Sequence, residues 1–142
     1  MTPFRQQWFR IAICVGVFAQ TGMAAEVKVI ANMNVAPSAI SSDELKRIFL
    51  ATKTSLEDGT HVQPVLAKSG ASHEAFLKSY IGKTDAALSI YYRSLVFTGK
   101  AALPKSFASD AEVTAYVAKT KGAVGYVSAA ASPAGVKILD IK

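Results

Sequence analysis

The sequence predicts an α/β fold in which one mixed or mostly parallel sheet is flanked by helices. Short runs rich in β-branched residues alternate along the chain with segments whose apolar residues recur at helical spacing. Two Ser-x-x-Glu capping boxes mark helix starts within that alternation. The 142 residues are enough for one compact domain, and no internal repeat or low-complexity stretch indicates a second.

Residues 1–25 have the pattern of a secretory signal peptide. Arg5 and Arg10 precede the uncharged apolar core Ile11–Ala19, and the segment ends in small residues. The apolar run is shorter than the roughly 20 residues that span a bilayer, so we expect cleavage rather than an uncleaved anchor. This predicts a periplasmic protein whose folded domain comprises residues 26–142.

The composition of the exported chain argues against several classes of function. Removing Arg5 and Arg10 from the 16 basic residues leaves 14 against 10 acidic ones, so the formal charge falls from +6 to +4. The lysines are scattered, with no basic run and no interleaved aromatics, which argues against nucleic acid as a partner. The single cysteine, Cys14, lies in the signal peptide, and the histidines are His61 and His73. We therefore expect no disulfide, no metal site and no cofactor.

The first predicted elements of the domain are a strand and a helix. Val27–Asn32 is a short β-rich run. Ser41 stands three residues before Glu44 as a capping box, and the helix that it opens has an apolar stripe through Phe49. The polar segment Ala51–Thr60 is predicted to form turns.

A second strand and two further helices follow. His61–Ala67 is predicted to be a strand, and Glu74–Ile81 a helix with one apolar face. Gly82 is placed to end that helix, because glycine readily adopts the left-handed backbone of a C-terminal cap. Thr84–Asp85 can cap the next helix, whose neighbouring tyrosines, Tyr91–Tyr92, we expect in the core and at its rim rather than on a ligand.

The last part of the chain predicts a loop, a helix and two strands. Ala101–Phe107 contains a proline and is expected to be a loop. Ser109 and Glu112 form the second capping box. Gly122–Val127 is a short apolar strand whose glycines allow another backbone or a ligand to approach closely, and Val136–Ile141 is a terminal strand.

The turn between the second strand and its following helix is the candidate functional site. It consists of Ser69, Gly70, Ala71, Ser72 and His73. The first N–H groups of a helix lack internal partners and carry a partial positive charge, so a phosphate, sulfate or carboxylate can bind there. A Ser-Gly turn that merely caps a helix has the same pattern, and capping without a ligand is the commoner case.

Several segments occur in an order and spacing that resemble a known family. They are Asp43–Leu50, Asp58–Gly59, Ser69–Phe76, Phe97–Lys100 and Gly122–Val127. Together they resemble the phosphate-specific substrate-binding proteins of ABC transporters, and in particular their short, single-lobe members. The resemblance implies one lobe of a type II periplasmic-binding-protein-like fold, with a non-catalytic function. It further implies phosphate or a similar small oxyanion as ligand and an ABC transporter permease as partner.

The same resemblance suggests roles within the turn, where the family's loop typically reads Gly-Ser-Gly-Thr-Arg. Ser72 keeps a hydroxyl, and the backbone amides of Gly70, Ala71 and Ser72 would form the phosphate cradle. His73 stands where arginine is usual. An imidazole is mostly neutral at pH 7 and gives one hydrogen bond where a guanidinium fork gives two. Nearby Lys68 either supplies further charge or is a solvated surface lysine, and the sequence does not decide between the two.

Two other classes of function were weighed against solute binding. One is an interaction module of the cell envelope, a single lobe that has lost solute binding and docks onto a partner or pairs as a homodimer to rebuild a two-walled cleft. A heavily apolar chain with few charges is compatible with such a surface. The other is catalysis, for which Ser72 beside His73 lacks a carboxylate placed in sequence to orient the imidazole.

Overall fold

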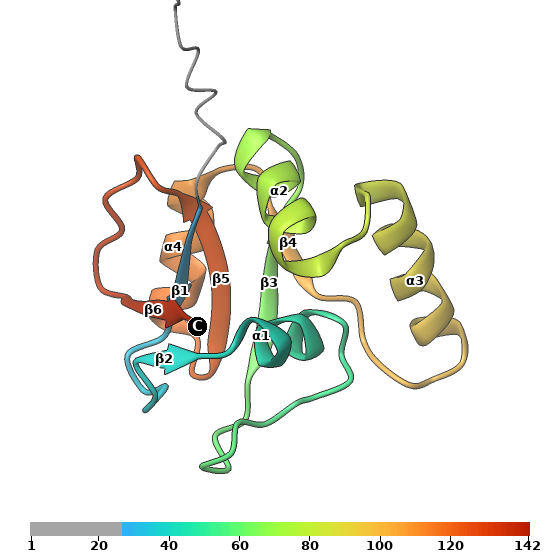
Figure 1. The fold of residues 1–142 in the computed structure, drawn as a ribbon, viewed down its shortest axis with the longest axis horizontal. Coiled ribbons are helices and arrows are strands. Elements are labelled where there is room, and N and C mark those ends of the chain that lie inside the picture. Colours follow the sequence, from blue (N-terminus) through green and yellow to red (C-terminus); the bar gives the residue numbers. More distant parts are fainter. Residues whose placement is uncertain (1–26) are drawn as a thin grey trace, which may run out of the picture.

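The structure, a computed structural model, describes residues 27–142. Figure 1 shows a single sheet with helices on both of its faces, which confirms the α/β class predicted from the sequence. The predicted signal peptide, residues 1–25, lies outside the described residues. Within the described part of the chain, no helix has the length and apolar character needed to cross a bilayer.

The sheet is mixed and has six strands in the order β2-β6-β1-β5-β3-β4. The strands are β1 (Val27–Ala31), β2 (Ala39–Ile40), β3 (Gln63–Ala67), β4 (Lys105–Phe107), β5 (Ala123–Ser128) and β6 (Lys137–Ile141). β1 pairs antiparallel with β5 and β6, β2 is parallel to β6, and β3 is parallel to both β5 and β4. In the parallel half, the carboxyl ends of β3, β4 and β5 therefore point toward the same edge of the sheet, where ligands bind in many α/β folds.

Four α-helices and one π-helical segment cover the sheet. They are α1 (Ser42–Phe49), α2 (Ala71–Phe76), the π-helical η1 (Leu77–Ile81) that continues α2, α3 (Asp85–Phe97) and α4 (Asp110–Lys119). In Figure 1, α4 lies behind the sheet and α1 and α2 lie in front, while α3 stands to one side.

The central strand β5 separates two hydrophobic cores, because its side chains alternate between the faces of the sheet. Val124 and Tyr126 join the core that contains the buried residues of α1, α2 and η1. Ala123 and Val127 join the smaller core beneath α4. In the larger core the ring of Phe76 stacks on Tyr126 with centroids 3.9 Å apart, and its edge contact with Phe49 has a centroid distance of 4.8 Å.

The local signals for helix ends are confirmed. The hydroxyls of Ser41, Thr84 and Ser109 each accept the backbone N–H three residues further on, at 3.1 to 3.2 Å. Gly82 ends η1 in the left-handed region, with φ 74°. These positions were predictable because a cap depends on only a few consecutive residues.

The helix of the candidate turn begins earlier than predicted, at Ala71 rather than Glu74. Its N-cap is Gly70, which has φ 112° and no side chain to mark the start in sequence. The Glu74 N–H already donates to the Gly70 carbonyl at 3.1 Å. Ser72 and His73 are therefore helical residues rather than loop residues.

Two short strands were not predicted, and one begins later than expected. β4 occupies the end of the predicted loop Ala101–Phe107, and its exposed Lys105 and Ser106 show no apolar alternation. β2 has two residues, too few for a period to appear. β3 begins at Gln63, because His61 forms an isolated bridge with Ser55 instead.

The sequence predicted that another backbone or a ligand approaches the glycines near β5 closely. In the structure, other residues of the protein make this close approach. Gly122, just before β5, has φ 76°, and a Cβ there would lie 2.2 Å from the carbonyl oxygen of His61. A Cβ at Gly125 would meet Val113 of α4 at 3.1 Å. Both glycines therefore serve packing.

Gly122→Ala should destabilise the fold far more than Gly59→Ala. Both glycines have positive φ, and left-handed alanine costs about 1–2 kcal/mol, but open space surrounds Gly59 whereas backbone blocks a Cβ at Gly122. We expect urea unfolding to show that modest loss for Gly59→Ala and a loss at least twice as large for Gly122→Ala. Equal losses would mean that the approach of Gly122 to His61 is not a constraint on the fold.

Candidate functional site

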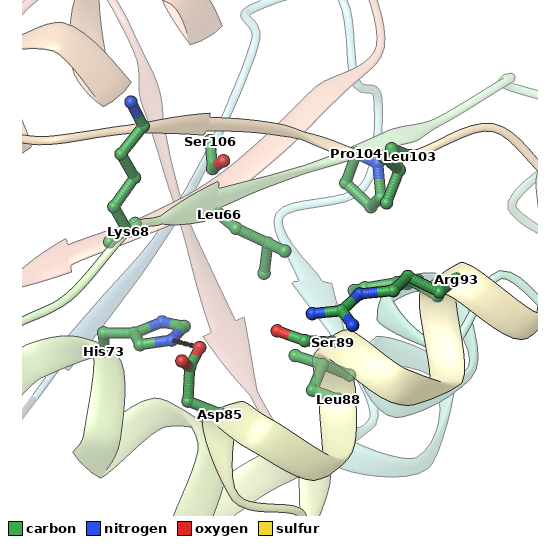
Figure 2. Close-up of a pocket in the computed structure, with 12 residues that line it drawn as sticks. Leu66, Lys68, His73, Asp85, Leu88, Ser89, Arg93, Leu103, Pro104 and Ser106 are labelled. Carbon is green, nitrogen blue, oxygen red and sulfur yellow. Dashed lines mark hydrogen bonds and ion pairs between the residues drawn. The ribbon is translucent and has the colours of Figure 1, made fainter. Parts of the chain in front are cut away.

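A cavity of about 280 Å³ lies beside β3 and β4, between the sheet, the start of α2 and the inner side of α3. Its charged and polar lining consists of Lys68, His73, Asp85, Ser89, Arg93 and Ser106. Leu66, Leu88 and Tyr92 contribute apolar surface. Figure 2 shows His73, Asp85, Ser89 and Arg93 around the opening between β3 and α3, whereas the ammonium of Lys68 points away from it. Two permanent cations, hydroxyls and one carboxylate therefore share one small cavity.

α3 supplies one wall because its polar residues recur every four positions. Asp85, Ser89 and Arg93 lie on one side of this helix, and all three line the cavity. In Figure 2 the guanidinium of Arg93 points into the cavity, next to the Ser89 hydroxyl. The opposing wall carries Ser106 on β4 and Lys68 directly after β3.

Two tyrosines attach α3 to the end of α1. The Tyr91 hydroxyl donates to the carbonyl of Leu50 at 2.5 Å, and the Tyr92 hydroxyl donates to the carbonyl of Phe49. Tyr92 is buried and Tyr91 is half-buried, which confirms their expected places in the core and at its rim. Burial also raises the pKa of the Tyr92 phenol. These bonds fix the side of α3 that faces the cavity.

His73 connects the cavity to the centre of the sheet. Its ring is 2% exposed, its Nε2 lies 2.8 Å from Oδ1 of Asp85, and its Nδ1 is hydrogen-bonded to the hydroxyl of Tyr126. The sequence analysis found no carboxylate for this imidazole. Asp85 provides one, brought 12 residues along the chain by the turn from η1 into α3. Both ring nitrogens are therefore engaged within the protein.

Tyr126 is the inner end of this hydrogen-bonded chain. Its hydroxyl accepts the backbone N–H of Ala67 at 3.1 Å, and its ring is fully buried. Burial raises the pKa of the phenol, although the bond from Ala67 opposes that rise. The Tyr126 hydroxyl therefore stays protonated over the whole physiological pH range and can donate a hydrogen bond.

The five predicted site residues are placed unequally around the cavity. Ser69, Gly70 and Ala71 are exposed in the turn and at the start of α2, and Ser72 is half-buried. Of the five, His73 lines the cavity. Lys68, which the sequence analysis considered as a source of charge, lines it as well. Gly70 offers no side-chain cap, which leaves the first N–H groups of α2 available to other acceptors.

Sequence reasoning missed Arg93, Asp85 and Ser89 as a group. Arg93 interrupts the apolar pattern of the helix that Thr84–Asp85 was predicted to cap. The signal was present, since the three residues are four positions apart and interrupt that pattern on one side. Ser106 had no comparable signal, because its position depends on the pairing of β4 with β3. Among residues 27–142, no group of three or more His, Cys, Asp or Glu could hold a metal ion.

The fold is similar to solved structures of phosphate transport proteins. An ABC-type phosphate transport receptor from Vibrio cholerae aligns with a TM-score of 0.64 and 17% identity, over 82% of this chain and 46% of that chain. A second structure is that of a Clostridium perfringens protein, assigned as a phosphate ABC transporter substrate-binding protein and solved with bound phosphate. It aligns with a TM-score of 0.64 and 14% identity, over 82% of this chain and 45% of that chain. PstS from Borrelia burgdorferi aligns with a TM-score of 0.53 and 12% identity, over 83% of this chain and 47% of that chain.

The present chain therefore spans a little less than half the length of these solved proteins. At such low identity the likeness establishes the expected fold, a single lobe of a periplasmic-binding-protein-like architecture. No protein-family model matches the chain, and no curated protein has a similar sequence. The solved proteins are transport receptors and substrate-binding proteins, in keeping with the expected non-catalytic class.

The buried tyrosines predict a loss of stability in alkaline solution. An unfolded tyrosine releases its proton near pH 10, whereas Tyr92 and Tyr126 have raised pKa values when folded. The unfolded chain thus binds fewer protons above about pH 10, and the free energy of unfolding falls as the pH rises further. Urea unfolding at about pH 8 and about pH 11 should show this loss, and Tyr126→Phe should reduce it. An equal loss in the variant would contradict the assigned role of burial.

Proposed function

We propose that the chain binds a small oxyanion, phosphate or a close analogue, in the cavity between β3, β4 and α3. The observation that carries the proposal is the guanidinium of Arg93 next to the hydroxyl of Ser89 at one cavity of about 280 Å³, whose lining also includes Lys68 and Ser106. Guanidinium and ammonium groups only donate hydrogen bonds, and hydroxyls can do so. A tetrahedral anion that offers acceptors on every side fits such a lining.

The predicted turn would complete this site from the side of α2. Lys68 lies at the end of β3, immediately before Ser69, and the first amides of α2 carry the partial positive charge of a helix start. Ser69, Gly70, Ala71 and Ser72 would then contact the anion through backbone amides and a hydroxyl at the rim of the cavity. In this proposal His73 acts from within the wall, because both of its ring nitrogens are already bonded.

Asp85 would determine which oxyanions the cavity accepts. It is the carboxylate of the cavity lining, and its side chain is 62% exposed. A carboxylate accepts a hydrogen bond from an anion that still carries a proton, as phosphate does near neutral pH. Fully ionised sulfate offers no donor, so two acceptors would face each other. The cavity should therefore prefer a protonated oxyanion to sulfate.

The setting that we propose is solute uptake across the cell envelope. Residues 1–25 have the pattern of a cleaved signal peptide, and residues 26–142 would form the periplasmic domain. The similar solved proteins are receptors and substrate-binding proteins of ABC transporters. By that likeness, an ABC transporter permease is the expected partner of the anion-loaded chain.

A second candidate function, an interaction module, is favoured by the outer side of α3. Ile90 is 65% exposed and Phe97 is 93% exposed, and these two residues are seven positions apart, on the same side of the helix. Such a surface would suit a protein partner or a second copy of the chain in a homodimer.

Arg93→Ala should weaken phosphate binding measured by isothermal titration. A charge-assisted hydrogen bond contributes about 1.5–3 kcal/mol, which corresponds to roughly a 10- to 100-fold loss of affinity. Arg47→Ala is the matched control, because Arg47 lies on α1, pairs with Asp43 at 2.9 Å and does not line the cavity. Equal binding by the two variants would exclude Arg93 as a ligand, and no heat from the parent with phosphate would favour the interaction module.

Asp85→Asn should reduce the preference for phosphate over sulfate. The amide removes the negative charge and adds a donor, so sulfate binding should improve relative to phosphate. Competition titrations with both anions at one salt concentration give the ratio of affinities, which we expect to fall by about tenfold, the effect of one hydrogen bond to a charged group. An unchanged ratio would show that Asp85 does not contact the bound anion.

A further inference from the structure

We propose that His73 is a positioning residue, which holds the carboxylate of Asp85 at the cavity and takes its own orientation from Tyr126. This inference rests on the proposed function for its effect on anion selection. Its structural part, the direction of each hydrogen bond, stands on the geometry alone. In this assignment His73 does not touch the anion, although the sequence comparison places it where an anion-binding arginine is usual.

The backbone N–H of Ala67 can only donate, so it sets the direction of the hydrogen bonds that follow it. The backbone N–H of Ala67 donates to the Tyr126 oxygen at 3.1 Å. The phenol is protonated, so its own O–H is free to donate to Nδ1 of His73, the next group in contact. A neutral imidazole that accepts at Nδ1 carries its proton on Nε2. That proton then points at Oδ1 of Asp85, 2.8 Å away.

The other protonation states leave a group without its partner. If the proton were on Nδ1, the Tyr126 oxygen would accept from both Ala67 and His73, its own O–H would have no acceptor, and Nε2 would present a lone pair to a carboxylate. If both nitrogens were protonated, the Tyr126 O–H would lose its acceptor inside the core. No buried side-chain polar atom of the described residues lacks a partner. The neutral Nε2–H form satisfies every group in the chain of bonds.

Burial indicates how this chain of bonds acts on the cavity. Tyr126 is fully buried and His73 is 2% exposed, whereas the Asp85 side chain is 62% exposed. A bond from a rigid interior donor to an exposed carboxylate fixes the rotamer of that carboxylate. Figure 2 shows Asp85 reaching from the start of α3 to His73, across the opening from Leu66 on β3. One carboxylate oxygen is thereby occupied, and the other remains for a bound anion.

The first test reads the proton position directly, without any anion. The chain contains two histidines, His61 and His73, so the full chain labelled with ¹⁵N-histidine gives two ring systems in nuclear magnetic resonance spectra. His61→Gln identifies the signals of His73. We expect a protonated Nε2 and an unprotonated Nδ1 in His73. A protonated Nδ1 would overturn the proposal.

Two variants test the two hydrogen bonds of His73, the outer bond to Asp85 and the inner bond to Tyr126. Asp85→Ala removes the acceptor at an exposed position, so the fold should persist while the Nε2 proton signal of His73 shifts. Tyr126→Phe removes the donor to Nδ1, and His73 should then populate both neutral tautomers. An unchanged His73 spectrum in either variant would overturn the corresponding bond.

The second test separates the two bonds of His73 by their effect on anion selection. In His73→Gln the amide nitrogen can occupy the place of Nε2 and still donate to Asp85. In His73→Asn the shorter amide reaches only the place of Nδ1. We expect His73→Gln to keep the ratio of phosphate to sulfate affinity within about twofold of the parent, and His73→Asn to lower the ratio as Asp85→Asn does. Thermal melting shows that each variant is folded before it is titrated.

The outcomes distinguish this inference from the proposed function. If the parent binds phosphate but His73→Gln and His73→Asn select anions equally well, oxyanion binding stands and the positioning role is wrong. If the parent binds neither anion, the proposed function fails, and the ring-nitrogen spectra still decide whether His73 is held as the Nε2–H form. A parent-like ratio in Tyr126→Phe, with a mixed tautomer, would show that the inner bond does not matter for selection.

Discussion

The hydroxyl of Tyr126 is the contact on which the arrangement of the site depends. It joins the backbone of β3, through the N–H of Ala67, to His73 on α2, and through His73 to Asp85 on α3. The Tyr126 ring also stacks on the ring of Phe76. Four separate elements thus meet through one side chain of the central strand. A buried hydroxyl with both a donor and an acceptor partner is costly to displace, because either partner would be left unsatisfied.

α3 shows how a helix at the edge of the main core builds a cavity wall. Leu88 and Tyr92 are its buried residues, and Tyr91 and Tyr92 bond to carbonyls at the end of α1. Because so few residues anchor this helix, one side remains free to line the cavity with Ser89 and Arg93. For the same reason its outer side is exposed, and the apolar side chains of Ile90 and Phe97 there would suit a partner. The proposed binding site and the proposed docking surface therefore lie next to each other on one helix, with Phe97 one turn beyond Arg93.

The composition of the cavity favours binding over chemistry. Cations and hydroxyls surround it, and the His73–Asp85 pair, which resembles half of a catalytic triad, points inward to a tyrosine that solvent does not reach. A nucleophile would need access to a substrate as well as a base. The likeness to half of a solved phosphate receptor concerns the fold alone, and the residues that would recognise an anion are this chain's own.

The elements whose ends are set by neighbouring residues were determined by the sequence alone. Hydroxyl caps at Ser41, Thr84 and Ser109, the glycine stop at Gly82 and the buried strand β5 all depend on contacts within a few positions. The turn that could bind an anion was also visible, as was the order of strands and helices that defines the α/β class. The short strands β2 and β4 escaped prediction because pairing with distant strands, rather than local preference, makes them strands.

Only the tertiary structure decided which polar residues share a cavity and which way His73 faces. Asp85, Ser89 and Arg93 were visible as separate residues, but their meeting with Lys68 and Ser106 required β3, β4 and α3 to be placed side by side. The sequence placed His73 in the turn before the helix. Its burial follows from a helix that begins at Ala71 and from a tyrosine that is 53 residues away along the chain. Contacts over such separations arise from packing, which no local pattern encodes.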